Sequence, residues 1–134
     1  MNKVILVLED SLSCQNLILG TLKKLAHITM VSTIQEARQF LRDNKTDLFV
    51  LDLKLPDGNG LEFFGEMQTS LQERTIPTII VSGDDDLSRK IAAFSSGVHD
   101  YIVKPYAPLE LRARVQRIIS DDSFKMLSFQ KMGL

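Results

Sequence analysis

The sequence predicts an α/β fold, because short apolar segments alternate with longer segments of helical spacing five times along the chain. The apolar segments are rich in β-branched residues and mostly apolar on both faces, as parallel strands covered by helices on both sides should be. The 134 residues suit one compact domain. At this length the natural arrangement is a doubly wound sheet of strand order 2-1-3-4-5 with right-handed crossovers.

The predicted strands are residues 4–8, 28–31, 48–51, 78–81 and 101–103. The segment HITMV, which contains the second strand, mixes polar and apolar side chains most, and this favours an edge position. The predicted helices are residues 13–25, 33–43, 60–71, 86–96 and 108–119. This order of elements indicates a flavodoxin-like (βα)5 arrangement.

Several residues mark the ends of the predicted helices. Ser32 and Gln35 have the spacing of a capping box before the second helix. Pro108 suits the first turn of the last helix, and Gly97 is placed to end the fourth. The apolar residues of the fourth helix are Leu87, Ile91, Ala92 and Phe94.

The composition argues against several classes of protein. The net charge of −1 gives no electrostatic reason to expect binding to nucleic acid or to an anionic membrane. The apolar run at 4–8 is too short for a signal peptide or a membrane span. The single cysteine, Cys14, excludes an intrachain disulfide and fits a cytoplasmic, reducing compartment. The two histidines have no cysteine cluster beside them, which argues against a zinc site.

Polar side chains follow four of the predicted strands at the point where each strand ends. These residues are Glu9 and Asp10, Asp52, Ser82, and Lys104. Because the strands are parallel, all four segments deliver their side chains to the same edge of the sheet, where ligands bind in such folds. Each residue also has a simpler interpretation: Asp10 as a helix cap, Asp52 in a turn, or Lys104 on a solvated surface.

The simpler interpretations fail jointly, because three carboxylates at one edge repel each other by about 1 kcal/mol per pair even in water. A cation relieves this repulsion, and a small set of oxygen ligands favours Mg²⁺. A metal ion beside a carboxylate suits phosphoryl chemistry, in which an aspartate can be the nucleophile. Asp52 would then carry the phosphoryl group, with Lys104, the Ser82 hydroxyl and the Gly83 N–H binding its oxygens. Asp86 is better explained as the cap of the fourth helix.

Four motifs in this order resemble those of a response-regulator receiver domain. They are VLED at 7–10, LDLKLPDGNGLEF at 51–63, VSGDD at 81–85 and DYIVKPY at 100–106. The resemblance implies a receiver domain over 1–119 that accepts phosphate and is not a turnover enzyme. It also implies a Mg²⁺ site formed by Asp10 directly, Glu9 mostly through water, Asp52 and the Lys54 backbone carbonyl.

The same resemblance implies roles for the remaining site residues. Asp52 is then the phosphoacceptor, Ser82 the switch hydroxyl, Tyr101 the switch aromatic that turns inward, and Lys104 the lysine that pairs with the phosphate, with a cis Lys104–Pro105 bond. The phosphodonor is a histidine kinase or a phosphotransfer protein. Phosphorylation would change the face formed by residues 86–96, 101–103 and 108–119.

This chain departs from the family pattern at a few positions around the site. Ser82 replaces the more frequent threonine, and Gly83 stands where alanine is common, which predicts a looser loop. Lys54 and Asp84 flank the acceptor, and a salt bridge between them would change the lifetime of the phosphate.

The output is less defined by the sequence. The residues at positions that resemble the dimer contacts of winged-helix transcription factors are Lys90, Phe94, Asp100, Glu110 and Arg114. Residues 120–134 resemble the start of a linker to a DNA-binding domain, so that DNA would be bound only through a domain absent from this chain. The alternatives are a solvated face without a dimer, a stand-alone regulator, and a non-phosphorylated pseudo-receiver.

Two enzyme and carrier classes fit the site poorly. A haloacid-dehalogenase-like phosphatase needs a second aspartate two residues after the nucleophile, where this chain has Lys54. A flavodoxin-like FMN carrier needs a Ser/Thr/Gly-rich phosphate loop after the first strand, where this chain has the acidic segment EDSLSCQN.

Overall fold

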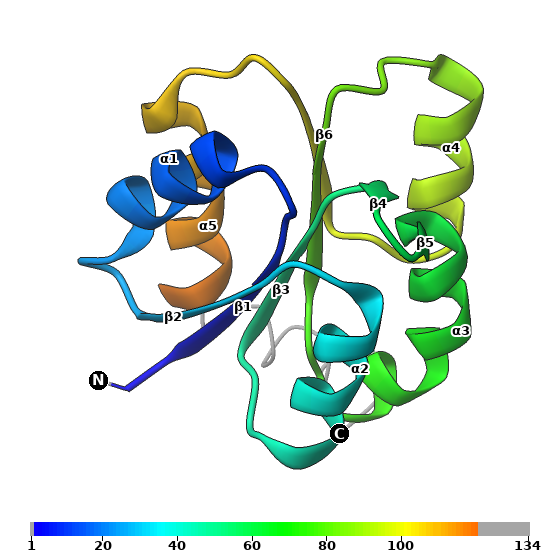
Figure 1. The fold of residues 1–134 in the computed structure, drawn as a ribbon, viewed down its shortest axis with the longest axis horizontal. Helices are drawn as coiled ribbons and strands as arrows, with labels where there is room; N and C mark the ends of the chain where they lie inside the picture. Colours follow the sequence, from blue (N-terminus) through cyan, green and yellow to red (C-terminus); the bar gives the residue numbers. More distant parts are fainter. Residues whose placement is uncertain (1, 121–134) are drawn as a thin grey trace, which may run out of the picture.

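A five-stranded parallel sheet lies between two layers of helices in the computed structural model, which describes residues 2–120 (Figure 1). The strands of the sheet are β1 (Val4–Leu8), β2 (His27–Val31), β3 (Leu48–Leu51), β6 (Thr78–Ser82) and β7 (Asp100–Val103). Their order is β2-β1-β3-β6-β7 and every neighbouring pair is parallel. This confirms the predicted doubly wound topology, with β2 at one edge.

A short hairpin between β3 and α3 was not predicted from the sequence. Its two strands, β4 (Lys54–Leu55) and β5 (Gly58–Asn59), are antiparallel and form a separate two-stranded sheet. The turn between them is Pro56–Asp57, and Gly58 adopts a φ of +153°, which favours glycine. The predicted Pro-Gly loop is therefore ordered by backbone pairing of its own.

The helices are α1 (Leu12–Leu22), α2 (Ile34–Asp43), α3 (Gly60–Glu73), α4 (Leu87–Ser95) and α5 (Pro108–Ser120). Helices α1 and α5 cover one face of the sheet, and α2, α3 and α4 cover the other (Figure 1). Each face has its own apolar core, because successive side chains of a strand point to opposite sides. Leu6 and Phe49 belong to the α2–α4 side, whereas Ile5 and Val50 belong to the α1–α5 side.

The predicted cap of α2 was wrong by one residue. Thr33 is the cap, and its hydroxyl accepts a hydrogen bond from the Glu36 N–H at 3.1 Å. The Glu36 carboxylate in turn accepts from the Ser32 N–H at 3.2 Å. The helix begins at Ile34, so the capping residues are Thr33 and Glu36 and not Ser32 and Gln35, and the return bond to Glu36 comes from the N–H before the cap.

Three other helix ends test the sequence predictions. The cap of α1 is Ser11 and not Asp10, which leaves the Asp10 carboxylate available at the end of β1. Asp86 caps α4, as predicted, by accepting a hydrogen bond from the Arg89 N–H at 3.0 Å. Gly97 follows α4 with a φ of +106°, the conformation that favours glycine after a helix.

Helix α4 packs on the sheet differently from the pattern of its sequence. Its fully buried residue is Ala93, whereas Leu87, Ile91 and Phe94 are exposed, Phe94 by 49%. The exposed fraction of these three side chains means that α4 contributes little apolar area to the core. It leaves an apolar surface on the outside of the helix.

Residue 120 ends α5, and the rest of the predicted linker at 120–134 lies outside the described residues. Within residues 2–120 we find no helix with the length and apolar character that a bilayer crossing requires.

Asp57 in the β4–β5 turn fastens this hairpin to the first turn of α2. Its two carboxylate oxygens accept hydrogen bonds from the N–H groups of Ile34 at 2.8 Å and Gln35 at 3.1 Å. The bond from Ile34 is the main cause of a lowered pKa of Asp57. Two free N–H groups of a helix N-terminus are thus satisfied by a residue distant in sequence.

We predict that Asp57→Asn reduces stability at neutral pH and that the difference from wild type disappears in acid. Because the folded-state pKa of Asp57 lies below 3.8, its contribution is present above that value and is lost as the pH falls through the lowered pKa. Urea unfolding between about pH 7 and about pH 2 measures this dependence. Asp43→Asn, at an exposed aspartate of α2, is the charge-matched control. A constant difference across the pH range would contradict the prediction.

Candidate functional site

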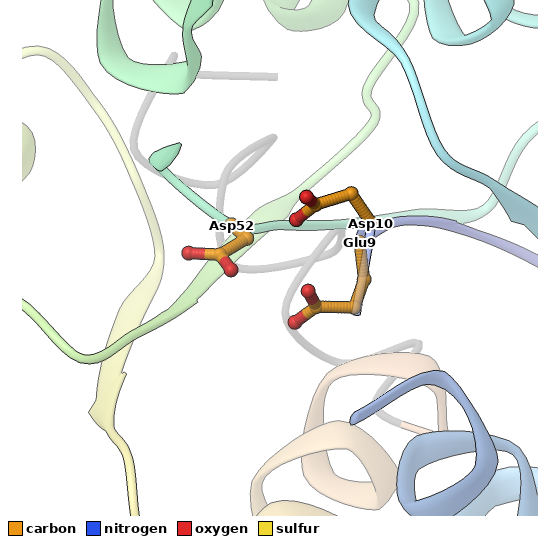
Figure 2. Close-up of side chains that lie close together, drawn as sticks. All are labelled: Glu9, Asp10 and Asp52. Atoms are coloured by element: carbon orange, nitrogen blue, oxygen red, sulfur yellow. The ribbon is translucent and has the colours of Figure 1, made fainter. Parts of the chain in front are cut away.

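Three carboxylates face one another at the carboxyl end of the sheet. Glu9 and Asp10 directly follow β1, and Asp52 directly follows β3 (Figure 2). One oxygen from each carboxylate lies within 4.8 Å of the others. Glu9 is 1% exposed and Asp52 is 9% exposed, whereas Asp10 is open to solvent. The cluster therefore has a buried floor and one exposed side.

The pairing of β1 with β3 brings these residues together. Leu8 is the register partner of Leu51, so the residues that follow them leave the sheet side by side. The Asp52 N–H donates to the Leu8 carbonyl at 3.0 Å, and the Glu9 N–H donates to the Val31 carbonyl at 3.0 Å. Both acidic residues are thus fixed by backbone hydrogen bonds at the point where the strand order reverses.

Lys104, which follows β7, supplies the positive charge of the site. Its Nζ donates to Glu9 Oε1 at 2.5 Å and to Asp52 Oδ2 at 2.9 Å. Burial favours the neutral amine, but these two hydrogen bonds and charges outweigh it and raise the pKa of Lys104. Burial also raises the pKa of Glu9, against the opposing effect of Lys104. The Lys104–Pro105 peptide bond is cis, as predicted.

Ser82, the predicted switch hydroxyl, is the last residue of β6, and β6 is the neighbour of β3, which leads to Asp52. Ser82 is buried, and its Oγ accepts a hydrogen bond from the Asp84 N–H at 3.2 Å. Gly83 follows it, and the space where a Cβ would stand contains no atom of residues 2–120 within 4 Å. Both residues therefore lie at the carboxyl end of β6, the strand next to β3.

The Tyr101 side chain points inward from β7 and is only 8% exposed. Its hydroxyl donates to the Asp84 backbone carbonyl at 2.6 Å. Burial is the main cause of a raised pKa of Tyr101, and the charge of Asp84 adds to it.

The predicted salt bridge between Lys54 and Asp84 was wrong. Asp84 pairs with Arg89 of α4, whose Nε lies 2.5 Å from Asp84 Oδ2. The Lys54 side chain is exposed, and the structure gives it no ion pair within residues 2–120. The β6–α4 loop is thus held by the helix that follows it and not by the loop across the site.

The charged residues predicted for a dimer have partners within the chain. Arg114 donates to Asp100 at 2.6 Å and lies 3.8 Å from Glu110. Lys90 pairs with Asp85 at 2.6 Å, and its Nζ also lies 5.9 Å from the centre of the Tyr101 ring. Phe94 is exposed on α4. Any pairing between copies would therefore compete with these internal ion pairs.

Gly60 contributes to the site, although the sequence analysis did not select it. A Cβ at Gly60 would lie 2.2 Å from the carbonyl oxygen of Asp52, and the Gly60 N–H donates to the Leu53 carbonyl at 2.7 Å. The start of α3 therefore packs directly against the backbone of Asp52. The PDGNG segment indicated a turn, but a close backbone approach has no signature in a single sequence.

The donor set of the cluster fits a small hard cation. Three carboxylates offer oxygen atoms only, which is the ligand type that Mg²⁺ prefers. With ligands at about 2.1 Å, opposite oxygens of a Mg²⁺ octahedron are about 4.2 Å apart, and retained waters fill a wider site. The exposed side at Asp10 leaves room for such waters.

Comparison with known proteins agrees with this geometry. Residues 5–116 match the model of the response regulator receiver domain, so the chain belongs to this family. It is 37% identical over 117 residues to the transcriptional regulatory protein BasR of Escherichia coli, covering 87% of this chain and 52% of BasR. It is 28% identical to a chemotaxis protein CheY homolog of Campylobacter jejuni, covering 89% of this chain and 94% of the homolog.

Solved structures have the same fold. The BeF3-activated DrrB receiver domain, from an OmpR/PhoB homolog of Thermotoga maritima, superimposes with a TM-score of 0.81 at 25% identity, covering 90% of this chain and 99% of that domain. The chain spans about half the length of the first curated relatives, which are transcriptional regulators. The family match identifies the chain as a receiver domain of the two-component response regulators.

Proposed function

We propose that this receiver domain, over 1–119, accepts a phosphoryl group on Asp52 from a phosphohistidine of a histidine kinase or phosphotransfer protein. The observation that carries the proposal is the position of the Asp52 carboxylate, which accepts a hydrogen bond from Lys104 Nζ at 2.9 Å and lies beside two further carboxylates at the end of the sheet. An acceptor in this position has a cation at hand for the charge that the phosphoryl group brings.

In the transfer step a carboxylate oxygen of Asp52 forms a bond to phosphorus as the phosphorus–nitrogen bond of phosphohistidine breaks. The imidazole leaves with the electron pair of that bond and takes up a proton from solvent. Lys104 then pairs with an oxygen of the new phosphoryl group in place of the Asp52 carboxylate. Ser82 and the Gly83 N–H are the donors for its other oxygens.

Glu9, Asp10, Asp52 and the Lys54 backbone carbonyl would hold Mg²⁺, with Asp10 as a direct ligand and Glu9 acting mostly through water. The ion supplies charge neutralisation for the phosphoryl oxygens when it is bound. The support in this chain is the oxygen-only cluster, its buried floor and its open side.

Phosphorylation switches the output through Ser82 and Tyr101. A dianion at Asp52 attracts the Ser82 hydroxyl, and the inward Tyr101 side chain fills the space behind it. The face of α4, β7 and α5 changes as a result and regulates transcription through a separate DNA-binding domain. The apolar surface at Phe94 supports a homodimer through this face, with Lys90, Asp100, Glu110 and Arg114 exchanging internal for intermolecular partners.

The coverage of the CheY homolog supports a second candidate, a stand-alone regulator that acts by protein–protein contact. The two candidates share the site chemistry and differ only in the output. Size-exclusion chromatography with light scattering, before and after phosphorylation, separates them. A phosphorylation-dependent dimer supports the transcriptional output, and an unchanged monomer supports the stand-alone regulator.

The phosphoacceptor proposal predicts that wild type takes up one phosphoryl group from acetyl phosphate in the presence of Mg²⁺, and that Asp52→Asn takes up none. Intact mass spectrometry measures the uptake, and Asp43→Asn is the control at an exposed aspartate. Absence of uptake by wild type, together with failure to bind beryllofluoride, would identify the chain as a pseudo-receiver. Undiminished uptake by Asp52→Asn would show that another residue is the phosphoacceptor.

The metal proposal predicts that Mg²⁺ stabilises wild type by about 1.4 kcal/mol for each tenfold rise above its dissociation constant. Asp10→Asn should remove most of this gain and should stabilise the metal-free protein by about 1 kcal/mol, because it relieves the repulsion from Glu9 and Asp52 and the structure shows no hydrogen bond to this exposed side chain from residues 2–120. Thermal unfolding across a Mg²⁺ titration measures both. Equal stabilisation of the variant and wild type would show that Asp10 is not a ligand.

A further inference from the structure

Three consecutive aspartates in the β6–α4 loop all bind Arg89 or Lys90 at the start of α4. Asp86 caps α4, Asp85 pairs with Lys90 at 2.6 Å, and Asp84 pairs with Arg89 at 2.5 Å. The two cations are neighbours in the first turn of α4. The loop is therefore tied to the helix by two adjacent ion pairs, and Asp84 is the partner nearest the site.

Asp84 connects α4 to both switch residues through its backbone. Its N–H donates to the Ser82 hydroxyl at 3.2 Å, and its carbonyl accepts from the Tyr101 hydroxyl at 2.6 Å. Its carboxylate accepts from the Asp86 N–H at 3.0 Å and from Arg89. The orientation of one residue thus sets the position of the acceptor that holds Tyr101 inside.

Arg89 is the cation that fixes this orientation. The Asp84 side chain is only 17% exposed, so its carboxylate depends on Arg89 for compensation of its charge. Gly83 precedes it, and within the described residues 2–120 nothing would contact a Cβ at that position, so the loop has little steric restraint of its own. Removal of Arg89 would let Asp84 turn toward solvent and withdraw its carbonyl from Tyr101.

We propose that the Arg89–Asp84 ion pair is a latch that holds the Tyr101 side chain in its inward position, with Arg89 as a positioning residue of the switch. The role in switching rests on the proposed function, whereas the effect on Tyr101 does not. Asp52, Lys104 and the metal-binding carboxylates are outside the latch. Its loss should therefore change the position of Tyr101 and the response of the α4 face more than the uptake of phosphate.

The test uses 3-fluorotyrosine incorporated in a Tyr106→Phe background, which leaves Tyr101 as the single tyrosine. Arg89→Gln should raise the exposed population of the ring about two- to fivefold, as fluorine NMR measures by the solvent isotope shift at neutral pH. Asp84→Asn should reproduce the effect, and Arg89→Lys should restore most of the inward population. Arg112→Gln, with the same loss of charge at an exposed position of α5, should leave Tyr101 unchanged.

The pKa of Tyr101 gives a second readout, because a ring that stays inside and a ring that moves out predict pKa changes of opposite sign. The charge of Arg89 lowers the pKa of Tyr101, while burial of the ring, the largest cause, raises it. If the ring stays inside, Arg89→Gln should raise the pKa further, and if the ring moves out, the pKa should fall toward 10.0. A ring exposure equal to that of Arg112→Gln, with or without a rise of the pKa, would overturn the latch.

Phosphate uptake separates this proposal from the phosphoacceptor proposal. Arg89→Gln should take up phosphate from acetyl phosphate at a rate within about twofold of wild type, because the ion pair is peripheral to the chemistry. A loss of uptake confined to Arg89→Gln, with Tyr101 still inside, would overturn the latch and assign Arg89 to the transfer step. Absence of uptake in wild type would contradict the phosphoacceptor proposal and leave the Tyr101 measurement as the test of the latch.

Discussion

The Gly60→Ala variant is expected to lose about 3 kcal/mol of unfolding free energy, which makes it one of the most damaging single-atom additions in this chain. The added Cβ would lie 2.2 Å from the Asp52 carbonyl oxygen and 2.9 Å from Leu53 Cα. Both are backbone atoms, so no side-chain rotation relieves the contact. The start of α3 or the backbone of Asp52 must therefore move, and phosphate uptake at Asp52 should fall as well.

Gly65→Ala is the matched control for this prediction. Gly65 is also in α3, and outside the local helix backbone no atom of residues 2–120 lies within 4 Å of the position of its Cβ. Alanine there should stabilise the protein by about 0.5–1 kcal/mol through helix propensity. Urea denaturation of both variants measures the difference, and similar stabilities would show that the contact at Gly60 relaxes without cost.

The fold was predictable because its signal is repeated. Five apolar runs with helical segments between them leave few topologies, and length selects the doubly wound sheet. The site followed from the fold, because Glu9, Asp52, Ser82 and Lys104 end different strands that the sheet brings to one edge. Only the sum of these residues distinguished a charged cluster from ordinary turn residues.

Features that depend on tertiary contacts were not predictable in this way. The hairpin of β4 and β5 has only two residues in each strand, too few for a periodic pattern. The choice between Ser32 and Thr33 as a cap depends on where the chain leaves β2, and both have suitable side chains. The predicted partner of Asp84, Lys54, was wrong. Arg89 reaches Asp84 from the first turn of α4, whereas Lys54 lies in the β4–β5 hairpin.

The burial of α4 was also not predictable from the spacing of its apolar residues. The spacing of its apolar residues was compatible with a buried face, but the helix is anchored mainly by Ala93, and Phe94 remains 49% exposed. Sequence alone does not distinguish an apolar face that packs on the sheet from one that faces outward. In a receiver domain this surface is beside Lys90, which contacts both Asp85 and the Tyr101 ring, so a change at the site has a direct route to it.

Lys104→Met is expected to destabilise the metal-free protein by about 2–4 kcal/mol at neutral pH. The change keeps the length of the side chain and removes the only cation that contacts Glu9 and Asp52 within residues 2–120. Two buried carboxylates then face each other without compensation. Chemical denaturation in the presence of EDTA measures the loss. Lys24→Met, at an exposed lysine to which the structure assigns no ion pair within the same residues, is the control and should change stability little.

The stability deficit of this variant should shrink on acidification, as that of Asp57→Asn does, although the carboxylate involved has a raised and not a lowered pKa. Burial already raises the pKa of Glu9 in wild type, and loss of Lys104 removes a charge that lowers it. A raised folded-state pKa gives stability that is present below the unfolded value, near 4.5, and lost as the pH rises through the folded value. The deficit of Lys104→Met should therefore be largest at neutral pH and shrink on acidification. Mg²⁺ should also reduce it, because a divalent cation compensates the same carboxylates. A deficit that is independent of both pH and Mg²⁺ would show that Lys104 stabilises the fold by packing and not by its charge.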